Sequence, residues 1–332
     1  MIELIRSGKT DEAGALLFDN NPLTAITGAV CPNHLFCKGT CVLGRKGNPV
    51  DFSKIEREVS KKYLETEELP RFTENNKRVL IVGSGPAGIA LAYYLRKQGF
   101  SVEVWEKEKQ LGGMLRYGIP DFRLDKSLID KVVSRLEKFG VRFRADSPVD
   151  LKNLPDGFDI TVLAIGAGVS KKLDIEGSEL AVPALEYLQN GKEASGNVIV
   201  IGAGNVAIDC ALTAAAYGAA SVSICYRKDE AAMKAYPDEL KLARNKGIVF
   251  NYFMVPKIIT KKGVTFDKQG QEVFMPADKV IVAIGQTATE DGLIKPEELG
   301  TNVYAIGDAV TGTSTIIEVV AAAKQLAEKI IG

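Results

Sequence analysis

The sequence predicts an α/β protein with two Rossmann-like dinucleotide-binding domains, one interrupted by the other, preceded by a small helical segment. Three observations support this prediction. An apolar strand runs into G-x-G-x-x-G/A twice, and the first glycines of the two fingerprints, Gly83 and Gly202, lie 119 positions apart. Strands and helices alternate from residue 77 onward, as they do in mostly parallel sheets. The first 70 residues are instead helical and charged, without strand alternation.

The N-terminal segment is expected to span residues 1–72. Apolar residues at helical spacing predict helices over residues 2–17 and 52–64. Between these helices lies a loop rich in Gly and Pro that holds three of the five cysteines: Cys31, Cys37 and Cys41. Residues 69–76 are expected to form a linker to the first nucleotide domain.

The first fingerprint follows the apolar strand at residues 78–82. Its first glycine permits a tight turn, the second lets the backbone approach a pyrophosphate, and the third allows close packing of helix on strand. The next strand ends at Glu106, whose carboxylate can accept hydrogen bonds from ribose hydroxyls and repels a 2′-phosphate. This chemistry suits FAD or NAD, and we assign the site to FAD. The fingerprint residues expected to bind it are Gly83, Gly85, Pro86, Ala87 and Gly88.

The second fingerprint differs in the charge that follows its second strand. The strand at residues 221–226 leads into Arg227 and Lys228, with Lys234 shortly after. Cations at this position suit the 2′-phosphate of NADP(H). The alternative is that Arg227 and Lys228 only cap a solvated loop. The fingerprint residues expected to bind NADP(H) are Gly202, Gly204, Asn205 and Val206.

The triplet Ala-Ile-Gly closes three separate apolar strands, at residues 164–166, 283–285 and 305–307. We expect the first and third of these strands to join the FAD sheet and the middle one to join the NADP sheet. The FAD-binding domain would then be discontinuous, spanning residues 77–178 and 290–332, with the NAD(P)H-binding domain inserted at 180–288. Two domains in simple tandem would leave the last forty residues without a sheet to join.

The composition and net charge indicate a globular protein and argue against a nucleic-acid partner or a membrane span. The hydrophobic fraction of 46% and the charged fraction of 25% are those of a soluble globular protein. The formal net charge is zero and no basic run occurs, so a nucleic-acid partner is not expected. No apolar stretch is long enough to span a bilayer and no signal peptide is evident, so we expect a cytoplasmic protein. The absence of Cys-x-x-Cys excludes a dithiol relay.

Residues 112–126 resemble the hallmark stretch of the glutamate synthase small-subunit family. That family includes the N-terminal part of dihydropyrimidine dehydrogenase and the NADP-binding subunits of ferredoxin:NADP oxidoreductases. Residues 21–44, with Cys-Pro-x4-Cys-x3-Cys-Val-Leu-Gly, resemble its iron–sulfur segment. The second fingerprint, the Tyr-Arg-Lys at 226–228 and the Gly-Asp at 307–308 are similar to its remaining motifs. The resemblance covers nearly the whole chain, with five motifs in the family's order.

The resemblance implies roles for further residues. Asp308 would contact the ribityl or pyrophosphate part of FAD, and Ala283 and Gly285 would pass along the nicotinamide half. For Arg123, which would contact FAD, the alternative is a surface ion pair with Asp121 or Asp125. For Asp308 the alternative, compatible with flavin binding, is a helix N-cap. The remaining residues expected near FAD are Lys107, Gly113, Met114, Leu115, Gly307, Thr315 and Ile316.

The sequence departs from the family in its cysteines. Each cubane cluster needs about four protein ligands, and here the candidate metal ligands are Cys31, Cys37, Cys41 and Glu56. His34 lies inside the loop and is a further candidate. Three interpretations stay open. A partner chain supplies the missing ligands, the loop holds one unusual cluster that uses Glu56 or His34, or the loop holds no metal. A zinc site with three cysteines and one histidine is also chemically allowed.

These features predict an NADPH-linked, FAD-dependent oxidoreductase. Because the cofactors supply the redox chemistry, no catalytic side chain is predicted. The electron acceptor would be a partner subunit, a ferredoxin-like carrier or an iron–sulfur centre. A non-catalytic nucleotide-binding assembly subunit and a free-standing ferredoxin–NADP reductase are the two alternatives.

Overall fold

The computed structural model describes residues 1–67, 69–190 and 193–332 and divides into two compact units. The first unit comprises Met1–Arg116, Asp121–Ala167 and Ala288–Gly332, and the second comprises Tyr117–Pro120 and Gly168–Thr287. The chain therefore passes from the first unit to the second at 167/168, upstream of the expected boundary at 178/180. The reason is a short antiparallel pair, β5 with β14, that belongs wholly to the second unit.

The N-terminal segment is helical, but it is not a separate body. It forms α1 (Ile2–Arg6), α2 (Thr10–Asn20), α3 (Thr24–Val30), the short η1 (Val42–Lys46) and α4 (Phe52–Tyr63). The helix predicted over residues 52–64 is α4, with Asp51 capping its N-terminus. The single helix predicted over residues 2–17 is wrong, because Gly8 has a φ of +76° and ends α1 there. Helix α3 was not predicted.

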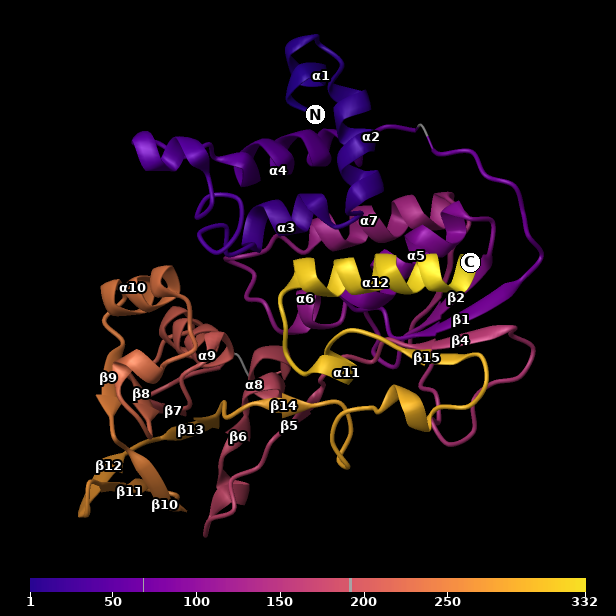
Figure 1. Ribbon diagram of the computed structural model, residues 1–332. Coiled ribbons are helices and arrows are strands. Elements are labelled where there is room, and N and C mark those ends of the chain that lie inside the picture. The colour runs from indigo at the N-terminus through magenta and orange to yellow at the C-terminus, as the bar shows by residue number, and fades with distance from the viewer. Residues whose placement is uncertain (68, 191–192) are drawn as a thin grey trace. The chain divides into compact units, whose positions relative to one another are not determined.

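Two tyrosines fasten these helices to the rest of the first unit. The Tyr93 hydroxyl donates to Asp19 Oδ1 at 3.0 Å, and the Tyr94 hydroxyl donates to the Asn20 carbonyl at 2.7 Å. Both tyrosines lie on α5 (Pro86–Lys97), above which the N-terminal helices pack in Figure 1. The expected linker is fastened too: Glu74 forms an ion pair with Arg96 at 2.7 Å. Residue 68, just before this stretch, lies outside the described residues.

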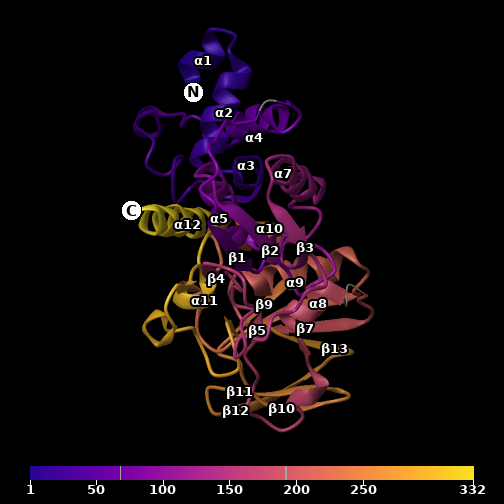
Figure 2. The same ribbon diagram turned by 90° about the vertical axis from the view of Figure 1, so that its right-hand side faces the viewer.

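The first unit contains a five-stranded parallel sheet of order β15-β4-β1-β2-β3. Helices α5, α7 and α12 lie along one face of it (Figures 1 and 2). Strand β15, from near the end of the sequence, pairs with β4 and completes the sheet that β1 begins. The interruption predicted from the Ala-Ile-Gly triplets is confirmed. The elements are β1 (Arg78–Val82), β2 (Ser101–Trp105), α6 (Met114–Tyr117), α7 (Ser127–Lys138), β3 (Arg142–Arg144), β4 (Ile160–Leu163), η4 (Pro296–Glu298), β15 (Val303–Ala305), α11 (Asp308–Thr311) and α12 (Ile316–Ile331).

The second unit repeats this plan with a parallel sheet of order β6-β13-β7-β8-β9. An antiparallel meander, β10-β11-β12, was not predicted; its buried face supplies Ile259, Val264 and Phe266 to the core. The elements are β5 (Val169–Ser170), η2 (Ser178–Leu180), β6 (Val182–Pro183), α8 (Ala184–Asn190), β7 (Asn197–Ile201), α9 (Asn205–Ala216), β8 (Ser221–Tyr226), η3 (Glu230–Ala232), α10 (Pro237–Asn245), β9 (Val249–Tyr252), β10 (Val255–Thr260), β11 (Gly263–Lys268), β12 (Gln271–Pro276), β13 (Lys279–Val282) and β14 (Gln286–Thr287).

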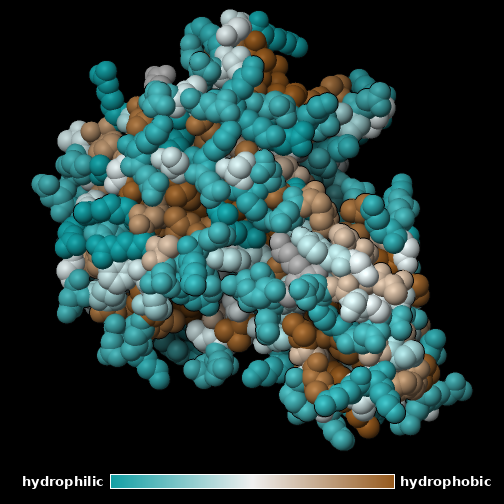
Figure 3. All heavy atoms as spheres, turned by 180° about the vertical axis from the view of Figure 1, so that it is seen from behind, coloured by the Kyte–Doolittle hydropathy of each residue, from teal (hydrophilic) through white to brown (hydrophobic). Residues whose placement is uncertain are grey.

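The surface is mainly hydrophilic on the face that Figure 3 shows, and hydrophilic side chains separate its apolar patches. Among the described residues, no helix combines the length and the apolar composition that crossing a bilayer requires.

Candidate functional site

The first fingerprint turns from β1 into α5 with three glycines in three different roles. Gly83 has a φ of +105°, and a Cβ there would come within 2.5 Å of the Ala164 carbonyl oxygen. Gly88 lies against that turn, because a Cβ on it would be 2.0 Å from the Gly83 oxygen. Gly85, the N-cap of α5, is different: a Cβ there would meet no heavy atom within 4 Å. The open position is therefore at the helix N-terminus, where a pyrophosphate fits.

Glu106, the predicted ribose ligand, is buried and holds the fingerprint in place. Its Oε2 accepts hydrogen bonds from the backbone N–H of Ser84 at 2.9 Å and from the Ser84 hydroxyl at 2.7 Å. Its Oε1 accepts from the Glu108 N–H at 3.0 Å. A carboxylate oxygen has two lone pairs, so Oε1 keeps capacity for a ribose hydroxyl. An acceptor of this kind fits the ribose hydroxyls of FAD.

Ser84 is a site residue that the sequence reasoning missed. Its hydroxyl also accepts the Gly112 N–H at 3.0 Å, which links Glu106 to the hallmark stretch. Gly113 is next in that stretch, and a Cβ on it would lie 2.9 Å from the Gly85 Cα. The structure therefore brings the hallmark stretch against the open glycine of the fingerprint. A serine between two glycines was the available signal.

The other residues predicted near FAD have varied environments. Met114 begins α6 and is half-buried, whereas Leu115 is 1% exposed and belongs to the core. Lys107 is exposed beside Glu108, with 3.9 Å between Nζ and Oε1. Arg123 is half-buried in the loop after α6.

The closing motif also reaches the fingerprint helix. Gly307 has a φ of +68°, and a Cβ on it would lie 3.1 Å from the Ala87 Cβ. Asp308 Oδ1 accepts hydrogen bonds from the Ser314 N–H at 3.1 Å and its hydroxyl at 2.7 Å. Burial raises the pKa of the Asp308 carboxyl above its ordinary value. The N-cap of α12 is Thr315, just before Ile316, so Asp308 organises the preceding turn instead of capping that helix.

The second fingerprint has the same backbone design. Gly202 has a φ of +144°, and a Cβ there would be 2.2 Å from the Ala283 carbonyl oxygen. Gly204 is the N-cap of α9, and a Cβ on it would meet no heavy atom within 4 Å. Asn205 Oδ1 accepts the Tyr236 N–H at 2.9 Å. The second fingerprint is therefore in contact with Ala283. Gly285 lies two residues beyond Ala283 and has a φ of +118°. Val206 is half-buried on α9.

The predicted cations lie exposed where β8 ends. Lys234 is brought to the fingerprint by its backbone N–H, which donates to the Ala203 carbonyl at 3.1 Å. Glu230, the glutamate that follows the cations, is already paired with Arg244 at 2.6 Å. Within the described chain, no ion pair engages the side chains of Arg227, Lys228 or Lys234. Three uncompensated positive charges fit a 2′-phosphate.

The candidate metal ligands of the cysteine loop have different environments among the described residues. Burial, with the nearby charges of Cys37 and Glu56, raises the pKa of the Cys31 thiol to about 11. Backbone N–H groups of Val50, Gly44 and Leu43 lower the pKa of Cys41 instead. In the part of the chain that the structure describes, no three His, Cys, Asp or Glu side chains are grouped so that they could hold a metal ion. The four predicted ligands share a loop and α4, but do not converge on one position.

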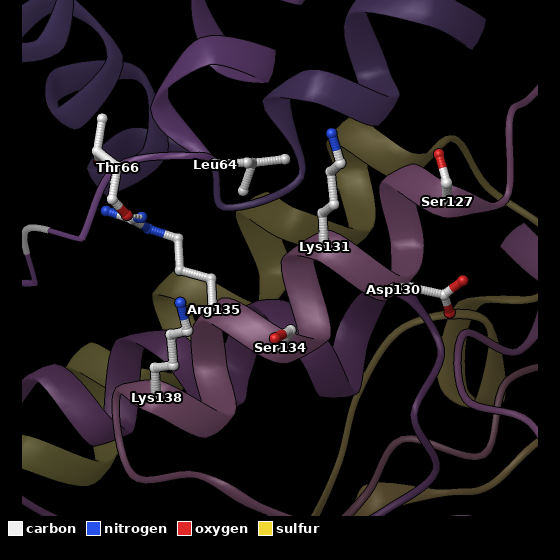
Figure 4. Close-up of a pocket in the computed structure, with 8 residues that line it drawn as sticks. All are labelled: Leu64, Thr66, Ser127, Asp130, Lys131, Ser134, Arg135 and Lys138. Atoms are coloured by element: carbon white, nitrogen blue, oxygen red, sulfur yellow. Dashed lines mark hydrogen bonds between the residues drawn. The ribbon is translucent and has the colours of Figure 1, made fainter.

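A pocket of about 360 Å³ lies between the end of α4 and α7 (Figure 4). None of its lining residues was predicted to bind a cofactor. Arg135 Nη1 donates to the Thr66 and Tyr63 carbonyls at 2.8 and 3.1 Å, and Lys131 pairs with Glu65 at 2.8 Å. These interactions fasten the N-terminal segment to α7, so we assign this pocket a structural role.

Comparison with known proteins identifies the family. Residues 77–327 match the family described as pyridine nucleotide-disulphide oxidoreductase. The chain belongs to this family. It is therefore an oxidoreductase, and its cofactors are FAD and NADP(H), as predicted. Residues 1–68 match a second family, described as dihydropyrimidine dehydrogenase domain II, 4Fe-4S cluster.

Curated relatives of this oxidoreductase confirm the glutamate synthase resemblance. The NAD-dependent dihydropyrimidine dehydrogenase subunit PreT of Escherichia coli is 31% identical, over 96% of this chain and 84% of PreT. The glutamate synthase [NADPH] small chain of E. coli is 27% identical, over 99% of this chain and 84% of the relative. The putative oxidoreductase AegA of E. coli is 30% identical, but this chain spans only 60% of its length.

Solved structures confirm the predicted fold class. Mycobacterium tuberculosis FprA in complex with NADPH has a TM-score of 0.64 at 19% identity, covering 77% of this chain and 84% of FprA. Lactococcus lactis thioredoxin reductase also has a TM-score of 0.64, at 20% identity, covering 77% of this chain and 98% of the reductase.

Proposed function

We propose that this oxidoreductase takes electrons from NADPH and delivers them to a partner subunit or an iron–sulfur carrier. When bound, FAD supplies the chemistry that accepts hydride from a nicotinamide and passes electrons onward. The observation that carries the proposal is the charge after each fingerprint: a buried carboxylate at Glu106, and exposed cations at Arg227 and Lys228 that form no ion pair among the described residues.

In this proposal the chain binds and orients, and no side chain transfers a proton. Gly85 and Gly204 leave room for a pyrophosphate at the N-termini of α5 and α9, where backbone N–H groups and the helix dipole favour an anion. Glu106 accepts hydrogen bonds from the ribose of FAD. We assign FAD contacts also to Gly113 and Met114 of the hallmark stretch and to the segment from Gly307 to Ile316, with Lys107 and Arg123 at the edge of the FAD site, whereas Leu115 packs in the core.

We propose the preference for NADPH over NADH from the charged residues after β8, because the names of the relatives disagree on the nucleotide. PreT is described as NAD-dependent and the glutamate synthase small chain as NADPH-dependent. A 2′-phosphate is a dianion that needs charged donors, and Arg227, Lys228 and Lys234 supply three. With Glu230 neutralised by Arg244, these cations remain available to that phosphate.

We infer a partner subunit because two relatives are named as parts of larger enzymes. PreT is named a dehydrogenase subunit, and the glutamate synthase small chain is one chain of a larger enzyme by its name. Cys31, Cys37, Cys41 and Glu56 are an incomplete ligand set for an iron–sulfur cluster within this chain, so we propose the electron acceptor outside it. We therefore route no electron transfer through this loop. The composition favours a cytoplasmic location for the assembly.

The test is anaerobic purification of the full chain, followed by flavin and iron quantification and a turnover assay on the same sample. We expect about one FAD per chain, absorbance near about 450 nm, and NADPH oxidation with ferricyanide as an artificial acceptor. A protein that neither contains nor takes up FAD would contradict the proposal. Nucleotide binding without dye reduction would support the assembly-subunit alternative instead.

A further inference from the structure

Glu103 lies in the middle of β2 and is only 2% exposed, yet three arginines reach its carboxylate. Arg142 Nη2 lies 3.2 Å and Arg78 Nη2 3.7 Å from Oε1, while Arg144 Nη2 lies 3.0 Å from Oε2. The Trp105 Nε1–H donates to Oε2 at 3.3 Å. These contacts join three neighbouring strands, β1, β2 and β3. We call Arg78, Arg142 and Arg144 the arginine triad.

The triad carries more positive charge than Glu103 requires. One buried carboxylate is compensated by one cation, so the cluster keeps two net positive charges. Those charges face water, because the three side chains are 49%, 62% and 53% exposed. The nearby Asp159 accepts the backbone N–H of Arg78 at 2.7 Å, and forms no ion pair with the triad among the described residues.

Aromatic rings support two of the three guanidinium groups. Arg78 lies over the Phe158 ring at 4.9 Å and Arg144 over the Trp105 ring at 5.2 Å. The two rings contact each other edge to face at 6.1 Å. Guanidinium groups held in this way lose little further side-chain entropy on binding an anion. The triad is therefore pre-organised while several of its N–H donors remain free to face solvent.

The triad is separate from the nucleotide site of the same unit. Successive strand side chains alternate between faces, so Glu103 and Trp105 share one face while Glu106 belongs to the other. The proposed FAD contacts use the turn after β1 and the residues that follow Trp105. Neither the fingerprint nor the proposed redox chemistry uses an arginine of the triad.

We propose that the arginine triad is a docking surface for a carboxylate-rich segment of a partner protein. Guanidinium groups recognise carboxylates by paired N–H donors, and three on adjacent strands match side chains of one acidic segment. Half-exposed side chains on a strand surface favour a macromolecule over an enclosed small anion. A chain of zero net charge without basic runs is not built for nucleic acid. The inference is independent of the proposed redox function.

Binding of fluorescein-labelled decaglutamate to the full chain, measured by anisotropy at low ionic strength, tests the proposal. The double variant Arg142→Gln/Arg144→Gln removes two triad charges and should raise the peptide Kd about tenfold. Lys261→Gln/Lys262→Gln removes two exposed charges from the turn after β10 and serves as the matched control, with an expected change below about twofold. Equal losses in the two double variants would overturn the proposal.

Further variants guard against a trivial loss of folding. Adding Glu103→Gln to the Arg142→Gln/Arg144→Gln variant removes the buried charge that the missing arginines leave unpaired. The Kd of this triple variant for the peptide should remain higher than that of the wild type. Glu103→Gln alone keeps all three arginines and frees them from their internal anion, so decaglutamate should bind more tightly than to the wild type. No gain with Glu103→Gln, or tighter binding of a single-stranded oligonucleotide of equal charge, would contradict a carboxylate-docking surface.

Discussion

After β2 of the first unit the chain places Glu106, buried and hydrogen-bonded, whereas after β8 of the second unit it places Arg227 and Lys228, which are exposed and without an ion pair in the described ranges. The backbones before these residues are alike: a left-handed glycine, an open N-cap glycine and a close helix. The backbone therefore selects a pyrophosphate in both units, and one or two side chains some twenty residues later select the ribose. Affinity for a dinucleotide and choice of dinucleotide are separable properties.

The largest effects should come from the open glycines. Gly85→Val points a side chain into the proposed pyrophosphate position and should lower the flavin content more than about tenfold. Gly204→Val should leave flavin content unchanged and abolish NADPH-dependent dye reduction. Both glycines have extended backbones that valine tolerates, so Tm should shift by less than about 4 °C. Flavin lost equally from both variants would show that the two units do not bind separately.

The next largest effect is expected on the KM for NADPH, at the ribose-binding cations of the second unit. Arg227→Ser/Lys228→Ser removes charge-assisted hydrogen bonds and should raise the KM for NADPH about hundredfold, with little change in the KM for NADH. Steady-state kinetics with ferricyanide measures both. Lys261→Ser/Lys262→Ser, which removes two lysines from the turn after β10, is the matched control. An unchanged ratio of the two KM values would mean that the cations only cap the loop.

A smaller effect is expected at the first ribose. Glu106→Gln keeps a carbonyl oxygen for Ser84 but loses the negative charge, and the Kd for FAD should rise about tenfold. Fluorescence titration of apoprotein with FAD measures this change. Ser84→Ala removes the hydroxyl bond alone and should weaken FAD binding less. If Glu106→Gln bound FAD as tightly as the wild type, the carboxylate would have only its internal role with Ser84 and Glu108.

The smallest effect concerns Asp308 and pH. Burial raises the pKa of this carboxyl in the folded state above 3.8, so the native state binds the proton more tightly than the unfolded state. Its contribution to stability is therefore present below about pH 3.8 and is lost as pH rises through the folded-state pKa. Asp308→Asn should raise the Tm of the apoprotein slightly at neutral pH and not at acidic pH. Thermal unfolding across pH checks this, and a gain that is largest at low pH would contradict it.

The sequence predicted those features that depend on neighbouring residues. The turn at Gly83 and the strand before it lie within a few positions of each other, so their pattern is local. It could not predict the contact of Ser84 with Glu106 and Gly112, which joins residues 22 and 28 positions apart. The arginine triad was missed for the same reason, since Arg78 and Arg142 meet Glu103 only through strand order. The break at Gly8 was missed because helical spacing continued on both sides of it.

The pairing of β15 with β4 has a consequence for how this protein is made. A ribosome releases the chain from its N-terminus, so β1 to β4 emerge before the second unit and well before β15. The second unit is one nearly continuous stretch and can fold as soon as it emerges, because domains generally fold as units during synthesis. The first sheet must wait, with the edge of β4 uncovered, until the last strand arrives. We therefore expect the first unit, and not the second, to depend on chaperones in the cell.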